Sequence, residues 1–359
     1  TNGRLPDTVG FGALRLTNGD ITNGGSNGDN QTGAVVGTKT FPTNQGLQVT
    51  FTTVTYGGDG NNGTGADGIS FFLSDGKYAP SVGGLGGSLG YSCSNVNAQY
   101  DGVVGGYLGI GIDEYGNFSN PGDNTNSGPG FKAGRISVRG AGNINWASLS
   151  AMDPVHYPPG TILTPDQQKA AVQNTCKTGK VMDYSVTTKT KCDSNGNNCT
   201  AVATSTPSGK ATATSLPDYP LLLNGTAYSN LPAGLSISNQ QGVNMPLRGK
   251  ATPITYALQI TQDGLLSLSY SVNGGAAQNV INKQSITDTN GPLPDNFRFG
   301  FSAGTGGSSN VHEITCFKAA PVNQSSSSAG TNVQQSARVE AGTQVYLAYY
   351  HQTNSWGEL

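Results

Sequence analysis

Charge is scarce in this sequence of 359 residues. Only 11% of the residues are Asp, Glu, Lys or Arg, against a typical share of about 25%, and the formal net charge at pH 7 is −2. Lysine and arginine form no basic patch of the kind that binds nucleic acid or anionic lipid, so we expect neither partner.

Long hydrophobic runs are also missing. No run approaches the roughly 18 apolar residues of a membrane span, so we expect no span. The first residues, Thr1–Arg4, lack the hydrophobic stretch of a signal peptide, and we expect the numbering to begin at a mature or recombinant boundary. The three histidines, His156, His312 and His351, are scattered and suggest no catalytic group; His312 reads best as a structural residue.

Glycine, by contrast, is abundant. The chain contains 53 glycines, about 15% of its residues and twice the usual share of roughly 7%, without a collagen period. Together with many Thr, Ser and Asn residues and short alternating apolar runs, this composition is typical of an extracellular all-β domain. The length allows one large β domain or two smaller ones.

Five cysteines fit an oxidising compartment. Cys192 and Cys199 bracket a turn-forming segment, which predicts a disulfide that closes a hairpin; a calcium loop is a weaker interpretation, because seven residues are too few for an EF-hand. Cys93 could pair with Cys176, but the sequence leaves the pairing open, and one cysteine must remain. No Cys-x-x-Cys spacing of the metal-binding type occurs.

The stretch Tyr107–Asp123 is the most informative part of the chain. It begins as a strand with Leu108, Ile110 and Ile112 on one face, and it runs into a loop rich in oxygen ligands. Those ligands are Asp113, Asn117, Asn120 and Asp123. Hard cations such as Ca²⁺ prefer carboxylate, amide and carbonyl oxygens, although Asp, Asn and Gly also favour ordinary turns.

Other segments read as strands from their β-branched and aromatic content. They are 11–16, 47–56, 254–260, 266–272, 297–301 and 345–350. Residues 65–73 read as a turn into a buried strand, and 134–146 as a strand and a turn ending at Trp146. The region 150–250 breaks this pattern, and we interpret it as a mixed insertion. It holds the only good helix signal, with Thr164 as N-cap and Pro165 at the first position, running to about Asn174. A Thr-rich hairpin follows, over 183–190 and 200–214.

Four motifs, in this order, resemble the legume-type (L-type) lectins. They are Ala66-Asp67-Gly68, Gly87-Ser-Leu-Gly90, Gly111-Ile-Asp113-Glu-Tyr115-Gly-Asn117, and Gly300-Phe-Ser-Ala-Gly-Thr-Gly306 with His312-Glu313. The resemblance covers roughly 10–150 and 250–318. It implies a concanavalin-like jelly-roll β-sandwich over 1–319, with the insertion at 150–250, and a domain that binds glycans without being an enzyme.

The resemblance also implies the site residues. Asp67 and Asn117 would bind the sugar through their side chains and Gly87 through its backbone N–H, with Gly307 and Ser308 as the rim. Charge-assisted bonds from sugar hydroxyls to a carboxylate are the strong ones. An aromatic would cover the apolar face of the sugar, and Tyr91, Tyr115 and Phe118 are all candidates.

Calcium would be bound by Asp113, the Tyr115 carbonyl, Asn117 and Asp123. At the family's second, transition-metal site the sequence departs from the pattern, since Gly111 and Arg135 occupy the Glu and His positions. Too few ligands remain there for such an ion, so the expected cofactor is Ca²⁺ alone. The loop up to Asp123 also differs in detail.

Residues 320–338 have the composition of a linker. The segment 339–359 resembles the start of the C-terminal domain in type IV pilus tip adhesins of the PilC/PilY type, and we interpret it as the first part of a truncated β domain. By this resemblance the chain would be an extracellular adhesin module on a bacterial surface or pilus tip. Its partners would be host or environmental glycans and, through the missing domain, pilus components.

Two other functions compete with a lectin. The domain could be a structural or protein-binding pilus module that calcium stabilises, because a fold does not fix a function. A jelly-roll glycanase needs two carboxylates about 5 Å apart, and Asp113 has no acidic partner on its strand face, so hydrolysis is the weaker alternative. Gly86–Gly90 matches the Gly-x-Ser-x-Gly elbow of hydrolases around Ser88, but no helix is expected after it.

Overall fold

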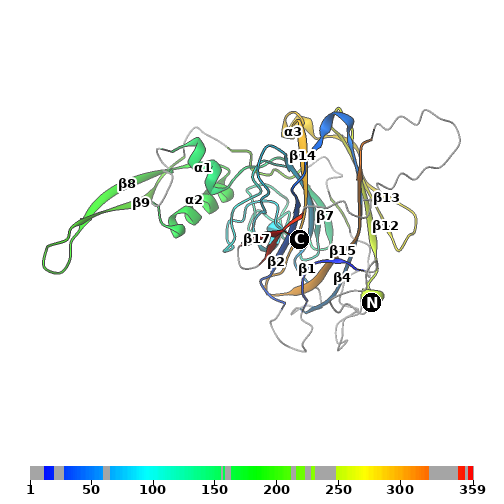
Figure 1. The fold of residues 1–359 in the computed structure, drawn as a ribbon, viewed down its shortest axis with the longest axis horizontal. Helices are drawn as coiled ribbons and strands as arrows, with labels where there is room; N and C mark the ends of the chain where they lie inside the picture. The colour runs from blue at the N-terminus through cyan, green and yellow to red at the C-terminus, as the bar shows by residue number, and fades with distance from the viewer. Residues whose placement is uncertain are drawn as a thin grey trace.

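Two antiparallel sheets make up the body of the protein (Figure 1). The structure, a computed structural model, describes residues 12–19, 28–59, 65–154, 157, 163–211, 216–222, 228–230, 248–322, 347–351 and 355–358. The predicted fold class, an all-β jelly-roll sandwich, is confirmed. Across the described residues no helix is long and apolar enough to cross a membrane.

One sheet has six strands in the order β1-β15-β4-β11-β12-β13. Their bounds are β1 Leu14–Thr17, β15 Ser309–Ala320, β4 Leu47–Asp59, β11 Ile254–Ile260, β12 Leu265–Val272 and β13 Gln278–Ser285. Strands β11 and β12 alternate buried and partly exposed residues, as a sheet with one solvent face requires. The predicted turn between them forms at Asp263-Gly264, where Gly264 has a φ of 79°.

The other sheet has nine strands, in the order β10-β7-β6-β5-β14-β2-β16-β17, with β3 paired to β14. Their bounds are β10 Tyr228–Asn230, β7 Arg135–Arg139, β6 Gly106–Asp113, β5 Gly68–Asp75, β14 Asn296–Gly304, β2 Thr32–Gly37, β16 Leu347–His351, β17 Ser355–Glu358 and β3 Phe41–Pro42. Strands β5 and β6 are buried on both faces along nearly their whole length. Something must therefore cover the outer face of this sheet as well.

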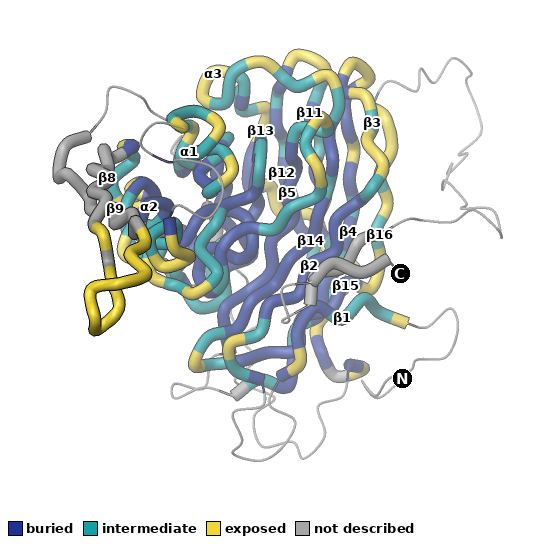
Figure 2. Tube along the Cα trace, turned by 60° about the vertical axis from the view of Figure 1, so that its left-hand side comes forward, coloured by how far each residue is buried: buried dark blue, intermediate teal, exposed yellow. Residues whose placement is uncertain are grey.

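The main core lies between the two sheets (Figure 2). The predicted face Leu108, Ile110 and Ile112 points into it, as do the aromatics of β14. Phe51 packs against Phe71 and Phe301 with ring centroids 5.5 and 5.2 Å apart, which joins the sheets at their centre. Aromatic pairs of this kind add to the hydrophobic contribution of the buried area.

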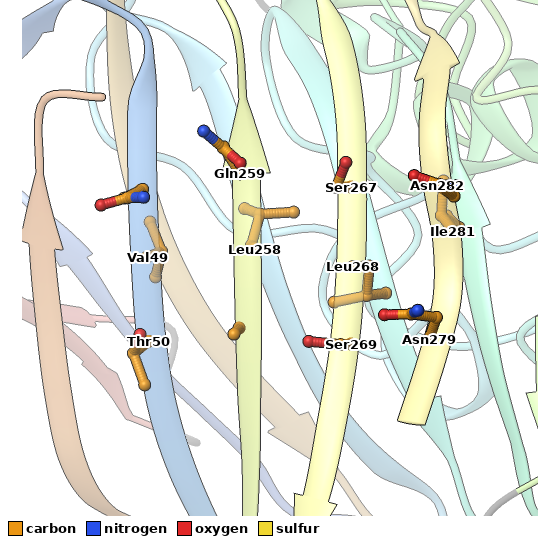
Figure 3. Close-up of a pocket in the computed structure, with 12 residues that line it drawn as sticks. Val49, Thr50, Leu258, Gln259, Ser267, Leu268, Ser269, Asn279, Ile281 and Asn282 are labelled. Atoms are coloured by element: carbon orange, nitrogen blue, oxygen red, sulfur yellow. The ribbon is translucent and has the colours of Figure 1, made fainter. Parts of the chain in front are cut away.

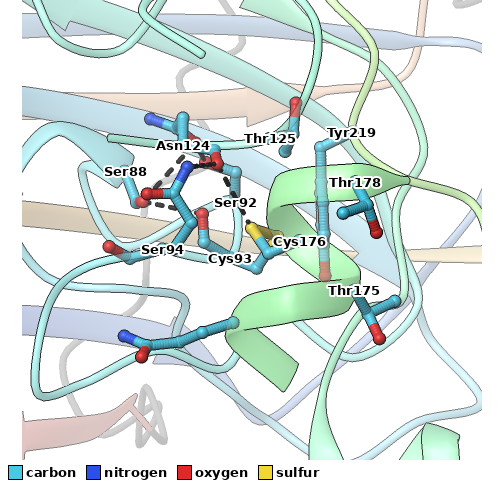
Figure 4. Close-up of a disulfide and its surroundings, with 12 residues drawn as sticks. Ser88, Ser92, Cys93, Ser94, Asn124, Thr125, Thr175, Cys176, Thr178 and Tyr219 are labelled. Atoms are coloured by element: carbon cyan, nitrogen blue, oxygen red, sulfur yellow. Dashed lines mark hydrogen bonds between the residues drawn. A yellow bond between two sulfur atoms is a disulfide. The ribbon is translucent and has the colours of Figure 1, made fainter. Parts of the chain in front are cut away.

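A second core covers the outer face of the nine-stranded sheet. It is built by loops 83–105 and 117–127 and by two helices of the insertion, α1 (Trp146–Met152) and α2 (Pro165–Thr178). The disulfide Cys93–Cys176 fixes α2 to the first of these loops (Figure 4). The insertion is therefore partly an integral layer of the fold.

The helix prediction for α2 is confirmed, including a capping box between Thr164 and Gln167. The helix continues beyond the expected end to Thr178, because Gly179 adopts the left-handed conformation that stops it. The expectation of a single helix was wrong. Asn145 caps α1 by accepting a 2.8 Å hydrogen bond from the Ser148 amide, and α3 forms at Thr287–Asn290. The strand and turn predicted over 134–146 correspond to β7, which ends at Arg139, and to the residues that lead into α1.

Strands β8 (Met182–Lys191) and β9 (Thr200–Ala211) form the predicted hairpin, which projects from the body (Figure 1). The Cys192–Cys199 disulfide closes its tip, and Cys316 is the remaining free cysteine. Strands β16 and β17 pair with each other, and β16 also pairs with β2. Most of the predicted linker lies outside the described residues, and the separate domain at 339–359 stays a prediction.

Candidate functional site

The strand register brings three of the sequence motifs to one end of the nine-stranded sheet. Gly68, at the start of β5, pairs with Asp113 at the end of β6 and with Gly304 at the end of β14. Antiparallel neighbours place the beginning of one strand beside the ends of the two that flank it. Three segments that are distant in sequence therefore lie side by side: Asp67, the loop 113–117 and the loop after Gly304.

Asp67 lies at the centre of this end. Its backbone N–H donates to the Gly304 carbonyl at 2.8 Å, and its carbonyl accepts from the Glu114 and Tyr115 amides at 3.0 and 3.1 Å. The peptide bond before it, Ala66-Asp67, is cis. Its side chain is buried, and its Oδ2 has no hydrogen-bond partner in the part of the chain that the structure describes.

The loop that contains Gly87 packs against the same end of the nine-stranded sheet. A Cβ at Gly87 would overlap the Cβ of Asn117 and Oδ2 of Asp123, so only glycine permits this approach. The Gly87 N–H, expected to be a sugar donor, donates to Asp123 Oδ2 at 3.1 Å. Gly87, Asn117 and Asp123 therefore lie together, and the charge of Asp123 acts on the Asp67 carboxyl. Their role in sugar binding stays a prediction.

The loop after β14 lies beside Asp67. A Cβ on Gly306 would sit 3.4 Å from Asp67 Oδ2, and the Gly306 amide donates to the Ser308 carbonyl at 3.1 Å. Gly307 is exposed, with open space where a side chain would stand. This loop therefore lies next to the unpaired carboxylate oxygen, and its role as a rim stays a prediction.

The expected metal ligands lie along the adjacent loop. Asp113 is fully buried, and its two carboxylate oxygens accept from the amides of Gly116 at 2.7 Å and Phe118 at 2.8 Å. Asn117 Oδ1 accepts from the Asn120 side chain at 2.9 Å. Within the described residues no group of three or more His, Cys, Asp or Glu side chains forms, so a cation here would also need the amide and carbonyl oxygens.

Three carboxyl groups at this end have raised pKa values. Burial, and then the negative charges of Asp123 and Glu114, raise the pKa of Asp67 to about 7. Burial raises the pKa of Asp113 well above its usual range, against the opposing hydrogen bonds from the Gly116 and Phe118 amides. Burial also raises the pKa of Asp123. Buried carboxylates crowded in this way favour a bound cation, which would restore their ionised forms.

An exposed aromatic near this end that the sequence motifs missed is Phe131. Of the three aromatic candidates, Tyr91 and Phe118 are fully buried in the second core, and no ligand could reach their faces. Tyr115 is partly exposed, and its ring meets that of Phe131 at 5.5 Å. Phe131 itself is 54% exposed, an unusual state for a large apolar side chain in this fold. Its position in a Gly-rich loop gave no sequence signal.

Gly111 and Arg135 stand at the two positions where the family resemblance would require the Glu and His ligands of a second metal. A Cβ at Gly111 would overlap the ring of Phe118, so this ring fills the space where a ligand side chain would point. Arg135 pairs with Asp113 in the register of β6 and β7. These residues do not fit a transition-metal ion.

The features of hydrolases find no support in the geometry. Glu114 Oε2 accepts from Asn310 Nδ2 at 2.6 Å and lies 3.3 Å from His312 Nε2, so it faces β15 and not Asp113. Ser88 is buried in a 3-10 turn and donates to the Cys93 carbonyl. His312 is buried between Thr17 and Glu114, as expected of a structural histidine.

A separate shallow hollow of about 300 Å³ lies on the outer face of the six-stranded sheet (Figure 3). Its lining carries no charge, and the polar groups are amides and hydroxyls such as Gln259, Ser269 and Asn282. It has no contact with the loops around Asp67, which end the other sheet.

No family model and no curated protein matches this sequence. Solved structures with a similar arrangement include lectin I-B4 of Griffonia simplicifolia in its metal-free form, at 12% identity and a TM-score of 0.43, covering 86% of this chain and 87% of that one. A second is the Bauhinia forficata lectin in complex with GalNAc, at 13% identity and a TM-score of 0.41, covering 87% of this chain and 88% of that one. A third is the VIP36 lumenal domain in its Ca²⁺- and mannose-bound form, at 12% identity and a TM-score of 0.40, covering 87% of this chain and 78% of that one. These likenesses are distant.

Proposed function

We propose that this domain is a calcium-dependent carbohydrate-binding module. The observation that supports it best is the buried Oδ2 of Asp67, which has no protein partner among the described residues and faces an open glycine loop. A buried carboxylate oxygen without a partner is costly, by roughly 1–3 kcal/mol or more. Ligand hydroxyls that donate to it would supply the missing hydrogen bonds.

The binding roles follow from the polar groups around Asp67. Its carboxylate accepts from two neighbouring sugar hydroxyls, and the Asn117 side-chain N–H₂ donates to one of them, since its Oδ1 already accepts from Asn120. The Gly87 amide would share its N–H between Asp123 and the ligand. Gly307 and Ser308 form the rim, and the Phe131 ring with Tyr115 covers the apolar face of the sugar.

Asp113, Asp123, the Asn117 side chain and the Tyr115 carbonyl would hold the calcium. All are oxygen donors, two of them carboxylates, and this is the ligand chemistry that Ca²⁺ prefers. When bound, the cation neutralises the buried carboxylates and fixes Asn117 in place. The chain itself orients the ligands, through the amides of Gly116 and Phe118 on Asp113.

A glycan array in calcium and in EDTA tests the function. The test variant is Asp67→Asn, which keeps the shape of the side chain and removes the charge. Its matched control is Asp101→Asn, because Asp101 is also a buried carboxyl with a raised pKa, but hydrogen-bonds the Trp146 amide in the insertion layer. We expect calcium-dependent hits that Asp67→Asn abolishes and Asp101→Asn preserves.

A blank array would reject carbohydrate binding. If calcium still raised the melting temperature of that unresponsive domain, the alternative function, a calcium-stabilised structural or protein-binding module, would take its place. The dense hydrogen bonding of Asp113 by its own loop is the feature that favours this alternative. Hydrolysis of a labelled oligosaccharide in the same panel would establish a glycanase instead.

We also propose that the module is an extracellular adhesin of a bacterial surface or pilus tip, linked to pilus components through a further domain. The support is the resemblance of the 339–359 segment and the two disulfides, which fit an oxidising compartment. Immunogold labelling of the source cells with an antibody to this domain tests the location. Label confined to the cell interior would reject it.

A further inference from the structure

Arg139 is a fully buried cation outside the main core. It follows Val138 on β7, and successive residues of a strand point to opposite faces. Val138 lies in the core between the sheets. Arg139 therefore points to the outer face of the nine-stranded sheet, beneath the loop 117–127 that carries Asn117 and Asp123.

The guanidinium binds both ends of that loop. Its Nε donates to the Phe118 carbonyl at 2.7 Å, and its terminal nitrogens donate to Thr125 Oγ1 at 3.0 Å and to the Ser127 carbonyl at 3.1 Å. It also donates to the Tyr219 carbonyl at 2.8 Å, which anchors the group to the layer behind. A planar fork with five N–H donors is suited to hold several acceptors in a fixed arrangement.

The loop is also held by packing. The Phe118 ring lies 5.5 Å from the Arg139 guanidinium and occupies the space left by the missing side chain of Gly111. No carboxylate among the described residues hydrogen-bonds Arg139, although Asp113 and Asp218 act on it through their charges. A buried cation without a direct ionic partner is expensive, so a purely structural clamp would be better built from neutral groups.

We propose that Arg139 is a positioning residue: an internal cation that orders loop 117–127 before any metal binds and so presents Asn117 and Asp123 in place. The effect of Arg139 on ligand binding rests on the proposed function. If the loop is already ordered, calcium and sugar binding do not have to order it, and the free-energy cost of binding is lower.

The test compares Arg139→Lys with Val138→Ala. The lysine keeps the charge but cannot bind both ends of the loop, whereas the alanine removes core packing from the neighbouring residue and should lower the melting temperature by about 5 °C. Hydrogen exchange of the Phe118 amide, which donates to Asp113, is measured in EDTA, and calcium affinity by titration calorimetry.

In Arg139→Lys we expect the Phe118 amide to exchange at least tenfold faster in EDTA and the calcium Kd to rise at least tenfold. In Val138→Ala the exchange rate of the Phe118 amide and the calcium Kd should both stay within about threefold of their values in the unmodified protein. Equal effects in the two variants, or unchanged exchange in Arg139→Lys, would overturn the proposal. If Arg139→Lys does not fold, Thr125→Val removes one acceptor of the guanidinium and should raise the same exchange rate at least threefold.

The two hypotheses fail in different ways. If the unmodified protein bound no calcium and no glycan, the proposed function would fall, and the exchange measurement in EDTA would still decide whether Arg139 orders the loop. If the unmodified protein bound both ligands and Arg139→Lys behaved like it, only the role of Arg139 would fall.

Discussion

Asn124 hydrogen-bonds the Gly87 carbonyl at 3.0 Å and thereby joins the two loops of the candidate site. The same side-chain N–H₂ group donates to the Asn117 carbonyl at 3.3 Å, and the Asn124 Oδ1 accepts from the Ser92 hydroxyl (Figure 4). Asn124 is fully buried. It contacts no ligand position, yet it sets the spacing between the proposed sugar-binding residues.

Replacing Asn124 by Asp should therefore weaken glycan binding. The substitution keeps the shape but replaces two donated hydrogen bonds with carboxylate oxygens that repel the carbonyls, at a cost of about 2 kcal/mol or more. We expect at least a tenfold loss of affinity for an array hit, measured by calorimetry. Asn290→Asp is the matched control, since Asn290 donates to the Tyr107 carbonyl at the other end of the sandwich. A similar loss in both variants would contradict the role of Asn124.

Calcium should stabilise the domain through Asp113. A ligand that binds only the folded state adds about 2.7 kcal/mol at a concentration of 100 Kd. We expect calcium to raise the melting temperature of the unmodified protein, and Asp113→Asn to remove most of that increase while lowering calcium affinity. Scanning calorimetry with and without EDTA gives the result. Asp263→Asn, at an exposed position, serves as the control. If Asp113→Asn bound calcium as the unmodified protein does, the metal site would not lie in this loop.

Phe131 should contribute to affinity through its exposed ring. Truncation to alanine removes an aromatic contact worth about 0.5–1.5 kcal/mol, so we expect glycan affinity to fall roughly two- to tenfold. The melting temperature should hardly change, because the ring is 54% exposed. Phe131→Tyr retains the ring and should bind like the unmodified protein. Normal binding by Phe131→Ala would remove this residue from the site.

Asp101 should make stability depend on pH. Burial raises the pKa of Asp101 to about 6 in the folded protein, against the opposing hydrogen bond from the Trp146 amide. Because the folded state holds this proton more tightly than the unfolded state, the contribution to stability is complete below about pH 4 and is lost as the pH rises to about 6.

Asp101→Asn should abolish that loss, since the amide oxygen still accepts from Trp146 and carries no charge. We expect the variant to be more stable at pH 7, by on the order of 1–3 kcal/mol, and equal to the unmodified protein near pH 4. Urea unfolding at both pH values measures the difference. The exposed Asp288→Asn is the control. An Asp101 variant that is less stable at pH 7 would contradict the burial argument.

The sequence by itself indicated many strands of the two sheets, including the strand that leads to Asp113, but it did not indicate β2, β13 or β15. The alternation of Leu108, Ile110 and Ile112 placed these three side chains on one face of the strand, and that face points into the core between the sheets. The sequence also predicted the Thr164 capping box and the Cys192–Cys199 hairpin, because each is formed by residues that are close together in the sequence. Short-range chemistry of this kind does not need the fold.

The tertiary structure decided what surrounds the site. Whether an aromatic is accessible depends on the layer that covers it, so Phe118 and Tyr91 proved to be core and Phe131 proved to be surface. The clamps of Asn124 and Arg139 join segments far apart in sequence, and their partners are backbone carbonyls that no residue pattern reveals. The sequence predicted which groups would bind calcium and sugar; only the packing of distant loops decided where those groups lie relative to one another.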